Sequence, residues 1–141
     1  MANDGSDFAR SMSIATSGLR AQAGRMRVIS ENIANADSTA ASAGGEPYRR
    51  KIPTFSSALD RSLDAKVVAL GKVRPDQSSY RIKYEPSNPA ADQAGNVKYP
   101  NVNPLVEMTD MREAQRSYEA NLNIISATRR MIQRTLDILK A

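Results

Sequence analysis

Apolar side chains recur with helical spacing along the first quarter of the chain. From Phe8 to Ile33 they alternate in steps of four and three residues, a heptad pattern typical of a helix that packs along one side. The pattern predicts a helix over residues 8–35. Gly18 and Gly24 lie inside it, and each either weakens the helix by about 1 kcal/mol relative to alanine or allows another backbone to approach closely. The stripe comprises Phe8, Met12, Ala15, Leu19, Gln22, Met26, Ile29 and Ile33.

The same spacing returns in the last quarter of the chain and predicts a helix over residues 110–139. Thr109 or Asp110 would cap this helix, because their side-chain oxygens accept hydrogen bonds from the free N–H groups of a first turn. The carboxylates of Asp110 and Glu113 suit the positive end of the helix dipole. The stripe comprises Met108, Met111, Gln115, Tyr118, Leu122, Ile125, Arg129, Ile132, Leu136 and Leu139.

Two such helices at opposite ends of one chain predict an antiparallel coiled coil. An isolated pair is marginal, because burying a large side chain contributes about 1.5–3 kcal/mol while ordering the backbone of one residue costs about 1–2 kcal/mol. Each helix also has a second apolar row, which favours packing against other subunits. The second rows are Ile14, Ala21 and Val28, and Ile124, Met131 and Ile138. The expected assembly interface comprises Met12, Leu19, Met26, Ile29, Ile33, Met111, Tyr118, Leu122, Ile125, Ile132, Leu136 and Leu139.

The middle of the chain contains all seven prolines, from Pro47 to Pro104. Since proline disrupts helix interiors, this segment is expected to be irregular or β-structured. Residues 54–66 are an exception, because Phe55, Leu59 and Leu63 have helical spacing, which favours a helix there.

Three stretches of the middle segment are predicted to be strands: residues 66–74, 79–84 and 96–99. In the second, Tyr80, Ile82 and Tyr84 alternate with basic residues and predict one apolar face. The sequence Ala94-Gly95-Asn96 predicts the turn before the third strand.

The expected fold is mainly α with a small β part. The terminal helices pair as an antiparallel coiled coil, and a small irregular or β middle domain joins them. The expected division is a disordered N-terminus over 1–7, an N-terminal coiled-coil helix over 8–36, a loop and linker over 37–65, a small β-rich outer domain over 66–103 and a C-terminal coiled-coil helix over 104–141.

The composition argues against catalysis. The chain has neither cysteine nor histidine, which removes thiolate chemistry, disulfides, the commonest general base and the commonest metal ligand. Gly44-Gly45 precedes Glu46-Pro47 rather than a helix start, so it is not a phosphate-binding loop. The acidic residues are scattered and lack calcium-loop spacing. We expect no enzyme activity, no cofactor and no metal.

The net charge of +5 raises nucleic acid and anionic membranes as partners. Basic and acidic groups are interspersed, and the one basic run is Arg49-Arg50-Lys51, whereas nucleic-acid binders concentrate charge on one face. Neither partner is therefore expected. No apolar run approaches the roughly 18 residues that span a bilayer, and the N-terminus lacks the basic and apolar regions of a secretory signal.

Five segments of the chain together resemble one family: Ser30–Ser38 (SENIANADS), Gly45–Lys51 (GEPYRRK), Tyr84–Asp92 (YEPSNPAAD), Gly95–Asn103 (GNVKYPNVN) and Arg116–Asn121 (RSYEAN). The first resembles the N-terminal signature of bacterial flagellar rod and hook proteins. The third and fourth are similar to the proximal-rod FlgC type. The signature residues are Asn32, Asn35, Tyr84, Pro86, Asn88, Pro89, Gly95, Pro100, Asn101 and Asn121.

The resemblance implies a structural subunit of the proximal rod in the flagellar basal body. Such proteins polymerise through their terminal helices into a periplasmic drive shaft that transmits torque. They assemble with themselves and other rod subunits, and the flagellar type III apparatus exports them without a cleaved signal peptide. Two alternatives remain: another rod or hook subunit, and a helical binding or adaptor module of the export system.

Overall fold

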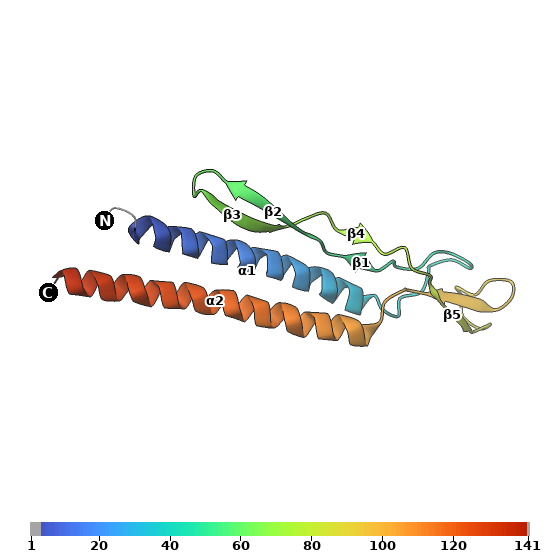
Figure 1. Cartoon of the computed structure of the whole chain (residues 1–141). Coiled ribbons are helices and arrows are strands. Elements are labelled where there is room, and N and C mark those ends of the chain that lie inside the picture. Colours follow the sequence, from blue (N-terminus) through green and yellow to red (C-terminus); the bar gives the residue numbers. More distant parts are fainter. Residues whose placement is uncertain (1–3, 141) are drawn as a thin grey trace. The chain divides into compact units, whose positions relative to one another are not determined.

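A computed structural model describes residues 4–140 of the chain (Figure 1). Two long helices, α1 (Asp4–Ala34) and α2 (Pro104–Lys140), flank six short strands in the sequence. The strands pair into three separate two-stranded antiparallel sheets, β1–β4, β2–β3 and β5–β6. The predicted class, mainly helical with a small β part, is confirmed. The strands are β1 (Lys51–Ile52), β2 (Phe55–Asp60), β3 (Ala65–Leu70), β4 (Arg74–Pro75), β5 (Arg81–Tyr84) and β6 (Asn96–Tyr99).

Both helices begin earlier than the sequence pattern predicts. Helix α1 starts at Asp4 rather than Phe8, so residues 4–7 are helical, and residues 1–3 of the expected disordered N-terminus lie outside the described residues. Helix α2 starts at Pro104 rather than Asp110. The apolar stripe marks only the part of each helix whose packing side is apolar, whereas the first turn of α2 buries the charged Glu107. The stripe therefore gives poor boundaries.

Asn103 caps α2, and the predicted cap at Thr109 or Asp110 is wrong. The Asn103 Oδ1 atom accepts a hydrogen bond of 3.1 Å from the backbone N–H of Leu105, as an N-cap side chain does. Pro104 follows at the first helical position, where its missing N–H costs no hydrogen bond. The Thr109 hydroxyl instead donates to the Leu105 carbonyl inside the helix, at 3.0 Å.

The expected helix over residues 54–66 is wrong, because this segment belongs to a β-hairpin. Strands β2 and β3 pair in register from Phe55 opposite Leu70 to Asp60 opposite Ala65. Apolar residues spaced by four lie on one side of a helix, but because four is even they also lie on one face of a strand. The turn decides between the two: the Asp60 carboxylate accepts hydrogen bonds from the N–H and hydroxyl of Ser62, and Asp64 has a positive φ of 46°.

The chain forms two compact units. The first contains residues 4–25, 54–72 and 113–140. Within it the β2–β3 hairpin lies beside α1, and α2 runs along the other side of that helix (Figure 1). A Cβ atom at Gly18 would lie 2.8 Å from the Asn121 side chain of α2, and one at Gly24 would lie 2.8 Å from Leu70 of β3. Both glycines therefore mark places where a neighbouring element approaches α1 closely.

The second unit contains residues 26–53 and 73–112. Its strands β5 and β6 form a hairpin whose turn residue Gly95 has φ of 80°, and the predicted strand over 96–99 is confirmed. The predicted apolar face of β5 is not buried, since Ile82 and Tyr84 are 66% and 72% exposed. The buried side chains are Val97 and Tyr99 of β6, which stand opposite Lys83 and Arg81.

Candidate functional site

Asn32, in the last turns of α1, has no solvent exposure and uses its whole side-chain amide in hydrogen bonds. Its Nδ2 donates to the Lys51 carbonyl at 2.8 Å and to Glu107 Oε2 at 3.0 Å. Its Oδ1 accepts from the Tyr48 hydroxyl at 2.8 Å and from the Lys51 N–H at 2.9 Å. An amide offers two donor hydrogens and two acceptor lone pairs, so no other residue of this size would satisfy all four partners.

Glu107, in the first turn of α2, is the charged centre of the same cluster. Its side chain is 1% exposed, and Arg50 Nε donates to its Oε1 at 2.6 Å. Arg50 also pairs with Asp76 at 3.3 Å. Burial disfavours the charge on Arg50, but the hydrogen bonds and charges of Glu107 and then Asp76 hold its pKa above the usual value. The buried carboxylate is thus compensated by an arginine and an amide.

Asn101 extends this cluster, the Asn32–Glu107 network, into the segment before α2. Its Oδ1 accepts the Arg50 N–H at 2.8 Å, and its Nδ2 donates to Ser78 Oγ at 2.8 Å. The N–H and hydroxyl of Ser78 in turn lower the pKa of Asp76, with Arg50 a weaker contributor.

Tyr48, which donates to Asn32, keeps its proton to unusually high pH. Its pKa is raised to about 12, first by burial and then by the negative charges of Glu31 and Glu107.

Arg81 connects two segments of the same unit. Arg81 donates to the carbonyls of Pro100 at 3.0 Å and Ala36 at 2.7 Å. These bonds join the chain leaving α1 to the chain entering α2.

Other signature residues of the second unit make hydrogen bonds that stabilise the end of α1 and the loop after β5. Asn35 Nδ2 donates to the Glu31 carbonyl at 2.9 Å at the end of α1. Asn88 donates to Glu85 Oε2 at 3.0 Å, and Tyr99 donates to the same oxygen at 2.9 Å. The hydrogen bonds of Asn88 and then Tyr99 lower the pKa of Glu85. The remaining members, Tyr84, Pro86, Pro89 and Gly95, lie in or beside this loop, and a Cβ at Gly95 would meet the Tyr84 ring at 2.8 Å.

The residues predicted for assembly differ widely in exposure within one chain. Ile29 is buried, and eight others are half-buried: Met12, Leu19, Met26, Ile33, Met111, Tyr118, Ile125 and Ile132. Three lie exposed on α2: Leu122 at 46%, Leu136 at 45% and Leu139 at 77%.

In the first unit, exposed apolar residues follow α2 on both sides of a buried row. The buried row, Ala114 and Thr128 with half-buried Asn121 between them, repeats every seven residues. At 3.6 residues per turn, Leu122 and Leu136 lie on one side of it. Ile124, Met131 and Ile138, all exposed, lie on the other. We call these two sets the flanking rows.

Sequence reasoning missed Tyr48, Arg50, Asp76 and Glu107 as members of one network. The one sequence signal for this network is Glu107, a glutamate between two apolar residues. That signal is not specific, because acidic residues are common in the first turn of a helix. Within residues 4–140, no group of side chains is arranged to hold a metal ion. Neither helix, over the same residues, has a stretch long and apolar enough to cross a membrane.

Comparison with known proteins matches both ends of the chain. Residues 12–40 match the family described as flagella basal body rod protein, and residues 93–138 match the flagellar basal body rod FlgEFG protein C-terminal family. The flagellar basal-body rod protein FlgC of Agrobacterium fabrum is 52% identical over 91% of this chain and 92% of its own. The FlgC protein of Bacillus subtilis is 39% identical over 92% of this chain and 97% of its own. The FlgC protein of Salmonella typhimurium is 38% identical over 89% of this chain and 92% of its own.

The chain belongs to the FlgC family of flagellar basal-body rod proteins. The resemblance predicted from the five motifs is confirmed, and with it the protein class, a structural subunit of the basal-body rod. Asn32 lies within the first matched range, and Asn101, Glu107 and Asn121 lie within the second. The Asn32–Glu107 network therefore joins residues from both regions that carry the FlgC resemblance.

Proposed function

We propose that this FlgC-family chain polymerises in the proximal rod and transmits torque along it. The terminal helices pair as an antiparallel coiled coil, and the segment over residues 66–103 forms a small outer part. The partners are further copies of this chain and other rod subunits. The role is structural, and it requires no catalysis and no cofactor.

Two contacts in the first unit support antiparallel pairing of the helices. Gly18 of α1 faces Asn121 of α2. Further along α1, Arg25 pairs with Glu113 at 3.6 Å, which comes earlier in α2. A later residue of one helix therefore meets an earlier residue of the other.

The exposure of the flanking rows is the observation that carries the proposal of polymerisation. The buried hydrophobic residues of the first unit are alanines, namely Ala15, Ala21, Ala65 and Ala114, and alanine contributes little apolar area. The large side chains of α2, such as Leu122 and Met131, stay exposed. Each gains about 1.5–3 kcal/mol when a neighbour covers it, so the rows favour contacts between subunits.

The Asn32–Glu107 network supports the transmission of torque. A satisfied buried polar cluster has a unique geometry, because displacement of any member leaves polar groups without partners. In the second unit this cluster holds α1, α2 and the segment around Tyr48–Lys51 together. A subunit that passes on rotation needs such stiffness at the ends of its helices.

We also propose export through the flagellar type III apparatus without cleavage, and residence in the periplasmic rod. The family resemblance motivates the route. The packing of α1 supports retention of the whole helix, since Ser17 accepts a hydrogen bond from the Val68 N–H and Gly18 contacts Asn121. Mass spectrometry of the assembled protein should find α1 intact, and a mature chain that starts within residues 20–30 would contradict this.

Cysteine cross-linking in purified basal bodies tests the proposed polymerisation. The chain has no native cysteine, so single substitutions report single positions. Leu122→Cys and Met131→Cys, one in each flanking row, should cross-link to neighbouring rod subunits through a maleimide–benzophenone probe. Its maleimide takes the new thiol, and its benzophenone inserts into a C–H bond of the neighbour on irradiation. Asn123→Cys is the control, because Asn123 is exposed and lies on the side of α2 away from the buried row. Equal cross-linking at all three positions would contradict the assigned surface.

A further inference from the structure

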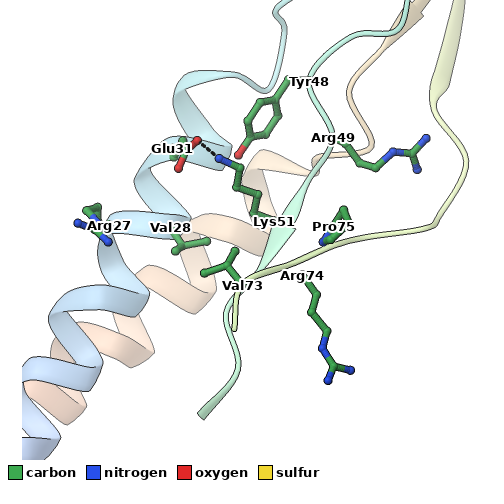
Figure 2. A pocket seen from close by; sticks show the side chains of 9 residues that line it. All are labelled: Arg27, Val28, Glu31, Tyr48, Arg49, Lys51, Val73, Arg74 and Pro75. Atoms are coloured by element: carbon green, nitrogen blue, oxygen red, sulfur yellow. Dashed lines mark hydrogen bonds and ion pairs between the residues drawn. The ribbon is translucent and has the colours of Figure 1, made fainter. Parts of the chain in front are cut away.

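A cavity of about 680 Å³ opens on the second unit, bounded by the end of α1, strand β1 and the segment around β4 (Figure 2). Three apolar side chains contribute to its lining, Val28, Val73 and Pro75. Four basic side chains lie around it, Arg27, Arg49, Lys51 and Arg74, against one acidic residue, Glu31. The cavity therefore carries an excess of positive charge.

The basic side chains of this basic cavity are engaged to different degrees. Lys51 pairs with Glu31. Arg49 donates a hydrogen bond to the Asp76 carbonyl at 3.0 Å, and its guanidinium lies 4.3 Å from the centre of the Tyr80 ring. Both partners are uncharged groups, so they position the guanidinium but leave its positive charge uncompensated. The guanidinium groups of Arg27 and Arg74 make neither a hydrogen bond nor an ion pair with any residue of the described range 4–140, and both residues are exposed. Two guanidinium groups are thus free to bind an anionic partner.

The arrangement of the guanidinium groups indicates the shape of that partner. In Figure 2 the side chains of Arg27, Arg49 and Arg74 spread outward in different directions around the rim, while Lys51 and Glu31 meet between them. A single phosphate or carboxylate needs converging donors, and these do not converge. An extended ligand with several separate carboxylates reaches more than one arginine and can contact the apolar lining residues as well.

We propose that the basic cavity binds an extended acidic peptide segment of another rod subunit. The proposal rests on the rod function proposed above. A second copy of this chain is a poor source for such a segment, because its net charge is +5 and no two of its acidic residues are adjacent. Those closest together on α2, Glu107, Asp110 and Glu113, already face Arg50 or Arg25.

Binding of a defined peptide by the full-length protein tests the proposal. The probe is a fluorescent peptide of alternating glutamate and glycine, about 12 residues long, which spans the cavity when extended at about 3.3 Å per residue. The double variant Arg27→Glu/Arg74→Glu should weaken binding about tenfold or more. The matched control Arg61→Glu/Lys98→Glu makes the same change in net charge at exposed residues that do not line the cavity and should change binding less than about twofold.

A third variant should change binding in the opposite direction. Glu31→Gln removes the carboxylate that occupies Lys51, so the peptide should bind more tightly than to the wild type. Equal loss in the cavity and control double variants, or no gain with Glu31→Gln, would overturn the proposal. The same would follow if the cavity variant lost binding to phosphatidylglycerol vesicles or an oligothymidylate but kept the peptide.

Measurements in cells separate this proposal from the rod function itself. The cavity variant should be exported but incorporated poorly into basal bodies, while the control variant is incorporated normally. If the cavity variant assembles and supports swimming like the wild type, the cavity proposal fails and the rod function stands. If the wild-type chain is absent from purified basal bodies, the rod function fails.

Discussion

Asn32 of α1 donates a hydrogen bond of 3.0 Å to Glu107 of α2, across 75 residues of sequence. Both side chains are buried, and the same two residues also hold Tyr48 and Arg50. The contact lies where α1 ends and α2 begins. It therefore fixes the chain at the point where the two helices connect to the strands of the second unit.

Replacement of Asn32 by alanine should strongly destabilise the second unit. Four hydrogen bonds are lost, and buried polar groups left without partners cost about 1–3 kcal/mol each. Chemical denaturation should show a loss of about 3 kcal/mol or more. Asn123→Ala is the matched control on an exposed position of α2. A loss below that of the control would show that the network contributes no stability.

Stability at high pH should depend on Tyr48. Its pKa is raised to about 12 from the ordinary 10.0, so the folded state keeps the phenol proton more tightly than the unfolded state. This contribution is complete below pH 10 and disappears as the pH rises towards 12. Tyr48→Phe should flatten the fall of unfolding free energy over that range. Identical pH dependence in wild type and Tyr48→Phe would refute the assignment.

Gly18 and Asn121 should be coupled energetically. Gly18→Ala places a methyl group 2.8 Å from Asn121 Oδ1, which offsets the gain in helix propensity of about 1 kcal/mol. In the Asn121→Ala background the clash is absent and the gain should appear. A double-mutant cycle of unfolding free energies should give a coupling of about 0.5–3 kcal/mol. Additive effects would mean that α2 does not approach α1 at Gly18.

Leu122→Asp should prevent rod incorporation while leaving the free subunit folded. Leu122 is 46% exposed in the single chain, so the unfolding free energy should change by less than about 1 kcal/mol. Under a neighbouring subunit the new carboxylate would be buried without a partner, which costs several kcal/mol. Glu119→Ala, also at an exposed position, should assemble and swim normally. Normal swimming of Leu122→Asp cells would remove the flanking rows from the assembly surface.

The helices could be predicted from the sequence because heptads persist over many turns and the ends of the chain lack proline. The apolar pattern alone places the start of α2 too late, at residue 110, because Asn103 acts through a single side-chain oxygen outside that pattern. The β2–β3 hairpin was missed because a spacing of four residues fits a helix and a strand equally well. Its Asp60–Ser62 turn contacts are local, so turn chemistry was the available signal.

The Asn32–Glu107 network could be predicted only in part from the sequence. The family resemblance points to Asn32 and Asn101 but does not indicate which residues they bind. Tyr48 and Glu107 meet Asn32 through tertiary packing, and no local spacing encodes which buried carboxylate an amide will find. The flanking rows were visible as apolar repeats, but which of the neighbouring rows faces α1 depends on the Gly18–Asn121 contact.

Electron cryo-microscopy of purified basal bodies most directly tests the claim that this chain is a rod subunit assembled through its helices. The map should contain this chain in the rod, with α1 and α2 antiparallel. Leu122 and Leu136 on one side of α2, and Ile124, Met131 and Ile138 on the other, should be covered by neighbouring subunits. Density for the chain outside the rod, or flanking rows that face open solvent within it, would contradict the account.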